Sequence, residues 1–271
     1  MSQRIHRPEP CLKLDAAVVD GRIPPRKAAA RLRDGHALRV VDSYSTGAEI
    51  LAQLPTLMPS LADDATYQER QAAERSHREA SLRLFAPISA HRVALAGARP
   101  IGFLQELYPE LDRFYLPFPV VQELHGAWGR YREGAHLAVL GHRVHPFFGT
   151  YVPARTSHLE LFGTWLSQYQ GPKDQAVDVG TGCGVMALML AKSGVERVLA
   201  TDCNPNATES LSRDLGRMSA APCIELATGD LFCGSQDRFD LIAFNPPWMQ
   251  GEADDLLEQA LYFEPGLFER F

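Results

Sequence analysis

The sequence predicts an α/β protein in which a Rossmann-like, doubly wound sheet follows a mainly helical N-terminal domain. Three observations lead to this fold class. Short apolar runs alternate with helical patterns from Gln175 onward, as they do in a parallel sheet wound with helices. A glycine-rich turn at residues 180–184 follows the first of these runs. Acidic residues end three successive runs, at the edge of the sheet where ligands bind in open α/β folds.

The composition is that of a globular protein that carries no general attraction for polyanions. A chain of 271 residues with 45% hydrophobic residues can bury a full core. The charged residues sum to −6, so no global basic field draws the chain toward nucleic acid or an anionic membrane. The five cysteines include no C-x-x-C pair, which argues against a disulfide framework and a structural zinc site. No apolar run approaches the ~20 residues of a membrane span, and we expect a cytoplasmic protein without metal.

Residues 1–134 are predicted to form the helical domain, with a role in recognising the substrate. Between residues 24 and 130 the chain is rich in Ala, Leu, Arg and Glu, and apolar residues recur at spacings of three and four in 28–32 and 104–111. Residues 63–83 carry many charges and few large apolar side chains, which predicts a mostly solvated helix. A plain surface helix is the favoured interpretation, and a helix over a cleft or against another chain is the alternative.

Residues 135–153 are predicted to form a hairpin that links the two domains. Two short apolar runs lie on either side of Gly141, a residue type typical of a turn. His142 and His145 do not predict a metal site, because a spacing of three on a strand places side chains on opposite faces.

Residues 154–271 are predicted to form the ligand-binding α/β domain. The expected strands are residues 175–179, 197–201, 223–227 and 239–244. The expected helices are residues 185–193, 205–218 and 254–261. Pro205 suits the first turn of its helix, where the missing N–H has no intrahelical partner to lose.

The turn after the first strand has the pattern of a cofactor loop. Gly180, Gly182 and Gly184 allow a sharp turn and a close approach of backbone to ligand. Their order is G-x-G-x-G, whereas a dinucleotide fingerprint is G-x-G-x-x-G with a helix aimed at pyrophosphate. Asp178 precedes the first glycine by two residues and would repel a pyrophosphate but attract a cationic sulfonium or ammonium group. The loop, Thr181 included, therefore predicts binding of S-adenosyl-L-methionine.

Two more acids follow the second and third strands. Asp202 lies 24 residues after Asp178, where an acid can accept both hydroxyls of an adenosine ribose. Asp230 can accept the adenine amino group, and the predicted cofactor site also includes Cys203 and Leu231. Each acid alone is more often a solvated strand-end residue or a helix cap. Three of them at the ends of successive strands favour a binding site.

The fourth strand runs into Asn245-Pro246-Pro247-Trp248, the predicted catalytic segment. The prolines fix the backbone and remove two donors, so the Asn245 side-chain oxygen and the Pro246 carbonyl are acceptors. A planar NH2 group that donates to them is held rigidly, and Trp248 offers a face on which a flat amide, guanidine or base can stack. The alternative is a strand followed by a Pro-Pro turn and a buried tryptophan. Asn245 is also expected to contact the cofactor.

From about residue 148 to 244 and through the NPPW segment, the chain resembles class I S-adenosylmethionine-dependent methyltransferases with an Asn-Pro-Pro-aromatic motif. That group includes release-factor glutamine N5-methyltransferases, adenine N6-methyltransferases of DNA and RNA, and guanine N2-methyltransferases. The layout is most similar to the glutamine N5 enzymes, through the segments Tyr-Val-Pro-Ala-Arg-Thr at 151–156 and Asp-Leu-Phe at 230–232. Trp248 stands where those enzymes usually have tyrosine. The resemblance implies that Tyr151 and Thr156 line the cofactor pocket and that Arg155 lies near its mouth, although Arg155 could equally be a surface cap.

The expected activity is transfer of a methyl group to a planar amide or amine nitrogen by direct in-line attack, without a covalent intermediate. A protein glutamine side chain is the favoured acceptor. An adenine or guanine base of RNA or DNA, or a small molecule, also fits the motif, and a non-catalytic cofactor-binding scaffold is the alternative from another class. Relatives continue with three more strands, so we expect the polypeptide to continue beyond Phe271 or another chain to complete the sheet.

Overall fold

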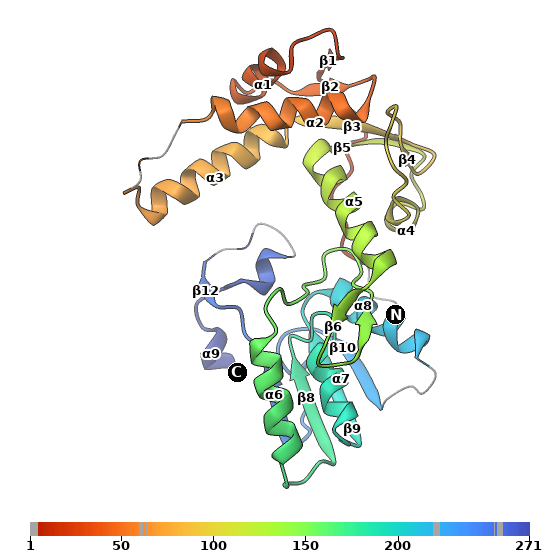
Figure 1. Ribbon diagram of the computed structural model, residues 1–271, viewed down its shortest axis with the longest axis vertical. Coiled ribbons are helices and arrows are strands. Elements are labelled where there is room, and N and C mark those ends of the chain that lie inside the picture. The colour runs from red at the N-terminus through yellow and green to blue at the C-terminus, as the bar shows by residue number, and fades with distance from the viewer. Residues whose placement is uncertain (1–4, 60–61, 63, 219–222, 252, 254–256) are drawn as a thin grey trace. The chain divides into compact units, whose positions relative to one another are not determined.

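The computed structural model describes residues 5–59, 62, 64–218, 223–251, 253 and 257–271 (Figure 1). These residues form two compact units. The N-terminal unit consists of residues 7–128, and the C-terminal unit consists of Ile5, His6 and residues 129–271. The boundary falls inside one helix, α5 (Phe118–Glu133).

The N-terminal unit combines helices with a five-stranded sheet. Its helices are α1 (Pro25–Arg33), α2 (Tyr44–Gln53), the 3-10 helix η1 (Leu54–Leu57), α3 (Tyr67–Ser81), α4 (Phe103–Leu107) and the first part of α5. Its strands are β1 (Ala17–Val19), β2 (Leu38–Val40), β3 (Leu84–Ser89), β4 (Arg92–Val93) and β5 (Arg113–Pro117). The strands follow the order β1-β2-β3-β4, and β5 pairs antiparallel with residues 85–89 of β3.

The helices of this unit are accompanied by a sheet that the sequence pattern did not predict. Four of its five strands have two to five residues, and such segments are too short to show a period of two against a helical background. The longest strand, β3, contains Pro87, a residue type that argues against a strand when only the sequence is read. The helical periodicity at 104–111 is realised only over Phe103–Leu107. The charged segment 63–83 does form a mostly solvated helix, α3, in which only Ala80 and Ser81 are buried.

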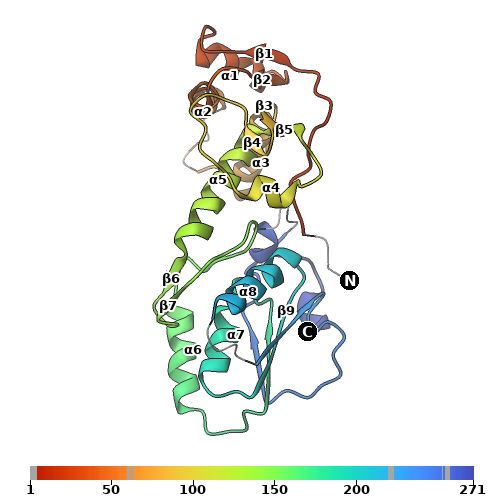
Figure 2. The ribbon, with the colours of Figure 1, turned by 90° about the vertical axis from the view of Figure 1, so that its right-hand side faces the viewer.

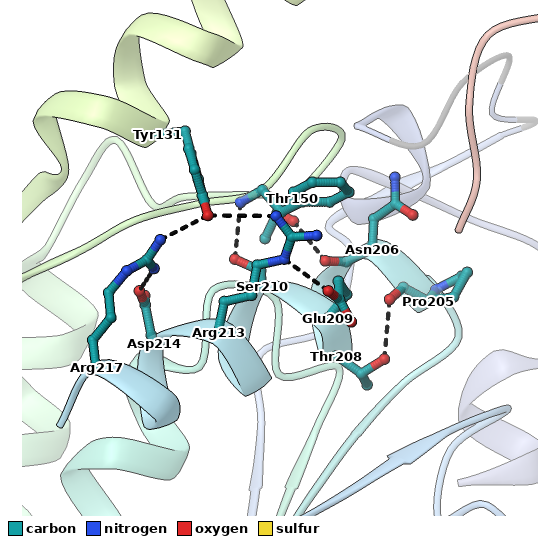
Figure 3. A network of polar contacts seen from close by, with 11 residues as sticks. Tyr131, Thr150, Pro205, Asn206, Thr208, Glu209, Ser210, Arg213, Asp214 and Arg217 are labelled. Carbon is teal, nitrogen blue, oxygen red and sulfur yellow. Dashed lines mark hydrogen bonds and ion pairs between the residues drawn. The ribbon is translucent and has the colours of Figure 1, made fainter. Parts of the chain in front are cut away.

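The predicted hairpin is confirmed as the antiparallel pair β6 (Ala135–Leu137) and β7 (His142–Val144). The chain that follows β7 lies along α8 (Pro205–Arg217) and is fixed to it by polar contacts (Figure 3). The buried Asp214 accepts a hydrogen bond from the backbone N–H of His145 at 2.8 Å, and Ser210 Oγ accepts one from Phe147 N–H at 3.0 Å. These contacts position the segment that leads to Tyr151.

The C-terminal unit contains the predicted parallel sheet. Its strands are β8 (Gln175–Val179), β9 (Arg197–Asp202), β10 (Ile224–Thr228) and β11 (Leu241–Phe244), in the order β10-β9-β8-β11. Helices α6 (Ser157–Gln168), α7 (Val185–Lys192) and α8 lie around them (Figure 2). All four predicted strands and the first two predicted helices are confirmed. Their apolar runs are long because both faces of the central strands are covered, as with the fully buried Ala176 and Val177.

The predicted helix at 254–261 can be compared only over residues 257–261, because residues 254–256 lie outside the described part. It is not formed there. Residues 257–261 contain only the 3-10 turn η2 (Glu258–Ala260), followed by β13 (Tyr262–Phe263), which pairs with β12 (Met249–Gln250), and then by α9 (Leu267–Arg270). The Leu261 carbonyl accepts the N–H groups of Trp248 and Met249 at 3.1 and 2.9 Å. The Leu261 carbonyl is thus bonded to N–H groups of residues 248 and 249, and not to N–H groups within a helix.

Among the described residues, β11 has a neighbouring strand only on the β8 side, and its Ile242 side chain is 53% exposed. No helix in the described part of the chain has the length and apolar character that a membrane crossing requires.

Replacing Gly184 with alanine should destabilise the C-terminal unit by about 2–4 kcal/mol, through strain and overpacking. Gly184 precedes α7 with φ +81°, and a Cβ there would lie 2.4 Å from Leu211 Cδ1 in α8. Thermal unfolding followed by circular dichroism measures the effect. Gly194→Ala is the matched control, because Gly194 also has a positive φ but has open space around its Cβ position. Equal losses in the two variants would show that the contact with Leu211 contributes nothing.

Candidate active site

A cavity of about 780 Å³ lies at the carboxyl ends of the four parallel strands. Its wall includes residues at the carboxyl ends of β8 (178–183), β9 (202–204), β10 (229–231) and β11 (244–249), together with residues 259–264 around β13. Ligands of open α/β sheets bind at this edge, and the volume is within the range of small-molecule and cofactor sites. The sequence pattern therefore brings the glycine loop, the acids and the NPPW segment to one cavity.

The glycine loop forms a tight turn for which glycine is suited. Gly180 and Gly182 have φ of +67° and +53°, values that residues other than glycine rarely adopt. A Cβ on Gly182 would lie at an ordinary contact distance of 3.4 Å from the Tyr151 carbonyl oxygen, so the backbone conformation and not a lack of room calls for glycine. Thr181 N–H donates to the Thr201 carbonyl at 2.8 Å, which ties the loop to β9.

Asp178 is buried beneath this loop, with 1% of its surface exposed. Its Oδ2 accepts hydrogen bonds from Thr181 Oγ1 at 2.7 Å and from Ala187 N–H at 2.9 Å. Burial, with a smaller contribution from the nearby Asp202 carboxylate, raises the pKa of Asp178 to about 7, although the two hydrogen bonds act to lower it. A carboxyl group with such a pKa favours a ligand that brings positive charge, because the charge restores the ionised form.

We expect the affinity for S-adenosylhomocysteine to fall as the pH is lowered below about 7. Burial raises the Asp178 pKa in the ligand-free protein to about 7, and the ammonium group of the ligand favours the carboxylate. Protonation of the free protein therefore competes with binding, at most about tenfold in Kd per pH unit below that pKa. Calorimetry between pH 5.5 and 8.5 measures the slope. Asp178→Asn should bind weakly and lose most of the slope, and an unchanged slope in this variant would assign the titration to another group.

Asp202 at the end of β9 supports the loop as well as facing the cavity. Its Oδ2 accepts the Gly182 N–H at 2.8 Å, and its Oδ1 accepts the Asn204 N–H at 2.9 Å. Each carboxylate oxygen can accept a further bond, as recognition of two ribose hydroxyls requires. Burial raises the pKa of the adjacent Cys203 thiol to about 11, so this side chain is a neutral thiol at physiological pH and not a nucleophile.

Asp230 also lines the cavity, but it is more exposed than the other two acids. Its carboxylate lies 3.4 Å from Arg270 Nε in an ion pair whose side chains are 64% and 48% exposed. Such an exposed pair is weak and can give way to a ligand. Leu231 follows with φ +45°, and its carbonyl accepts a bond from Thr201 Oγ1 at 2.6 Å. The role of Asp230 toward an adenine amino group stays a prediction.

The NPPW segment forms part of the same wall. Trp248 is 70% exposed, which removes the alternative of a turn with a buried tryptophan. Its indole Nε1–H donates to Asn245 Oδ1 at 3.3 Å. That bond fixes the carboxamide with its oxygen toward the indole and leaves the second lone pair of Oδ1 for another donor.

The remaining predicted residues divide between the wall and its support. Tyr151 and Arg155 line the cavity, whereas the described wall does not include Thr156 or Gly184. Thr156 precedes α6 and donates from Oγ1 to Glu160 Oε1 at 3.1 Å. Gly184 instead provides the close packing against Leu211. Both residues are next in sequence to residues that line the cavity, but each lies immediately before a helix, Thr156 before α6 and Gly184 before α7.

Several wall residues were not predicted. They include His6, His158, Asn204, Ala207, Phe244 and the β12–β13 and α9 segments. Asn204 and Ala207 could have been expected from their position just after Asp202. His6 carries no such signal, because it lies 145 positions before Tyr151, the next wall residue along the chain. Within the described part of the chain, no group of three or more His, Cys, Asp or Glu side chains could hold a metal ion.

Comparison with known proteins finds similarity in the part of the chain that forms the sheet and its cavity. Residues 160–262 match the family described as the methyltransferase small domain. A release factor glutamine methyltransferase of Koribacter versatilis is 35% identical over 95 residues, which cover 34% of this chain and 33% of that protein. A release factor glutamine methyltransferase of Rhodopirellula baltica is 33% identical over 98 residues, covering 35% and 33%. A ribosomal protein L11 methyltransferase of Staphylococcus carnosus is 30% identical over 80 residues, covering 30% and 26%.

The matches span 26% to 33% of the length of these three curated relatives. The matched part contains the cofactor loop, the three acids and the NPPW segment. The similarity therefore concerns the C-terminal unit and its cavity.

Proposed function

We propose that this chain, whose residues 160–262 form a methyltransferase small domain with an S-adenosylmethionine site, methylates a planar amide or amine nitrogen. The proposal depends mainly on one observation, that the NPPW segment and the glycine loop with Asp178 line the same cavity. Asn245, Pro246 and Trp248 provide acceptors and a flat face, and the glycine loop with Asp178 provides a site for a cationic cofactor. Neither group alone would distinguish a methyltransferase from a plain binding domain.

The residues present fit S-adenosylmethionine. Gly180 and Gly182, which lie in the cavity wall with positive φ, expose backbone without side chains to a ligand, and no phosphate group would meet the buried Asp178 favourably. Asp178 Oδ1 would hold the ammonium group, because both hydrogen bonds to this carboxylate end on Oδ2. Asp202 would hold the ribose. The bound cofactor supplies a methyl group on a positively charged sulfur.

The chain's own part in the reaction is to position the acceptor nitrogen. Asn245 Oδ1 and the Pro246 carbonyl accept the two N–H groups of a planar nitrogen, which turns its lone pair away from the protein backbone. These acceptors also stabilise the positive charge that develops on nitrogen as it is methylated. The Trp248 indole orients Asn245 through the 3.3 Å bond, and its exposed face can stack on the substrate.

A protein glutamine side chain is the favoured acceptor. The names of the similar proteins refer to a release factor and a ribosomal protein, which supports a protein substrate. A glutamine carboxamide presents one planar NH2 group, which is the donor that the two acceptors match. The net charge of −6 weighs against naked nucleic acid, since binders of nucleic acid usually show a basic footprint.

Transfer of a tritiated methyl group from labelled cofactor into cell extract tests this function. The extract is separated afterwards into protein, RNA and small-molecule fractions. We expect label in the protein fraction that acid hydrolysis releases as methylamine, because the label is on an amide nitrogen. Label confined to RNA or small molecules would replace the substrate assignment. Cofactor binding without transfer to any fraction would favour a non-catalytic scaffold.

A further inference from the structure

The start of the described chain is fixed to the methyltransferase unit by one buried side chain. Asn206, in the first turn of α8, is fully buried. Its Oδ1 accepts the backbone N–H of His6 at 2.8 Å, and its Nδ2 donates to the His6 carbonyl at 2.8 Å. The same Nδ2 donates to the Phe148 carbonyl at 2.9 Å. The amide thus pairs with both backbone groups of His6, as a neighbouring strand would.

These bonds hold His6 firmly because breaking them would leave a buried amide without partners. An unsatisfied buried polar group is costly, and Asn206 would lose a partner for its oxygen and for one of its two N–H groups. The local setting of Asn206 is fixed as well. Its own N–H donates to Asn204 Oδ1 at 2.9 Å, and Asn204 Nδ2 donates to the Gly149 carbonyl at 2.8 Å. Figure 3 shows Asn206 and Pro205 at the start of α8.

The His6 side chain is exposed and forms part of the wall of the cofactor cavity. Asn204 and Ala207, on either side of its anchor in sequence, are also wall residues. Hydrogen bonds connect the anchor to the ribose-binding candidate, because Asn206 N–H donates to Asn204 Oδ1 and Asn204 N–H donates to Asp202 Oδ1. An adenosine bound to Asp202 would therefore lie near this part of the wall, and the amino-acid moiety of the cofactor near Asp178 and the glycine loop.

We propose that His6 is a cofactor-contacting residue of the adenosine subsite, delivered there by the bond pair with Asn206. The imidazole offers an N–H donor, and the side chains of the acids at this end, Asp202 and Asp230, offer only acceptors when ionised. A donor at this place complements the acceptor nitrogens of adenine, which the acids cannot bind. This inference rests on the proposed function, since it requires an adenosine-containing cofactor.

Calorimetric binding of S-adenosylhomocysteine and of 5′-methylthioadenosine to the full chain tests this proposal. His6→Ala should raise Kd roughly three- to tenfold for both ligands, the range expected for one hydrogen bond. The two losses should be equal, because the ligands share the adenosine and differ in the amino-acid moiety. Asp178→Asn, in contrast, should weaken only the ligand that carries the amino acid. His6→Gln should retain affinity within about twofold, since it keeps an N–H donor, whereas His6→Phe should not.

His142→Ala is the matched control, because His142 is exposed on β7 of the same unit and is not part of the described cavity wall. It should bind both ligands like the wild type. The melting temperature of ligand-free His6→Ala should also equal that of the wild type, since the backbone bonds to Asn206 remain. Unchanged affinity in His6→Ala, or a loss seen only with S-adenosylhomocysteine, would overturn the role of His6 while leaving the proposed function intact. A wild-type chain that binds neither ligand would overturn both.

Discussion

Asn245→Ala should lower kcat by about 10²–10³-fold while leaving the affinity for cofactor nearly unchanged. This is the loss measured when one preorganised hydrogen-bonding group at a reacting centre is removed, roughly 3–4 kcal/mol of transition-state stabilisation. Asn245 Oδ1 is one of two acceptors in the predicted catalytic segment, and the variant removes the one whose orientation the indole of Trp248 fixes at 3.3 Å. Single-turnover methyl transfer and calorimetric binding of S-adenosylhomocysteine separate the two quantities.

Gln250→Ala provides the control for this variant. Gln250 lies on β12, five residues after Asn245, is exposed, and is not part of the described cavity wall. It should transfer methyl groups at the wild-type rate. A wild-type kcat in Asn245→Ala would rule out the positioning of the acceptor nitrogen by this side chain. A loss of cofactor affinity as large as the loss of kcat would instead make Asn245 a binding residue for the cofactor.

The C-terminal sheet could be predicted because several levels of information in the sequence agree there. Buried parallel strands give continuous apolar runs, and the residues that follow them meet at one edge whatever the details of the intervening helices. Asp178, Asp202 and Asp230 could therefore be grouped correctly without knowing their contacts. The direction of a side chain next to a helix start is a finer property. Thr156 bonds Glu160 and Gly184 packs on Leu211, although both adjoin residues that do line the cavity.

The features that could not be predicted depend on contacts between distant parts of the chain. The short strands of the N-terminal unit are stabilised by pairing across the sheet, as in the parallel pair of β1 with β2, and carry little pattern of their own. The link between His6 and Asn206 also joins distant parts of the chain. The Asn206 amide bonds the backbone N–H and carbonyl of His6, and backbone groups leave no pattern in the sequence. The end of β11 was predicted, but the bonds from Trp248 and Met249 to Leu261 replaced an expected helix.

Asp202→Ala should weaken the binding of S-adenosylhomocysteine at least about 100-fold, the largest effect on affinity that we expect from one substitution. Two contributions add. The variant removes the acceptors for the ribose hydroxyls, and hydrogen bonds to a charged group contribute roughly 1.5–3 kcal/mol each. It also leaves the N–H groups of Gly182 and Asn204 without the carboxylate that now accepts them at 2.8 and 2.9 Å. The cofactor loop then keeps its bond from Thr181 to the Thr201 carbonyl but loses the bond to Asp202. Calorimetry measures the change in Kd.

Asp202→Asn separates these two contributions. Asp174→Ala controls for the loss of negative charge, because Asp174 is an exposed acid before β8, at the opposite end of the sheet. The carboxamide can accept from only one of the two N–H groups, and its own NH2 faces the other, so the loop is disturbed on one side. We expect an affinity between those of the wild type and Asp202→Ala. If Asp202→Asn binds like the wild type, neither charge nor the double acceptor matters, and the ribose must be held elsewhere. If it binds as weakly as Asp202→Ala, the hydrogen bond from Gly182 and the recognition of the ribose depend on each other. The ribose hydroxyls would then bind a carboxylate that the Gly182 and Asn204 N–H groups already hold in place.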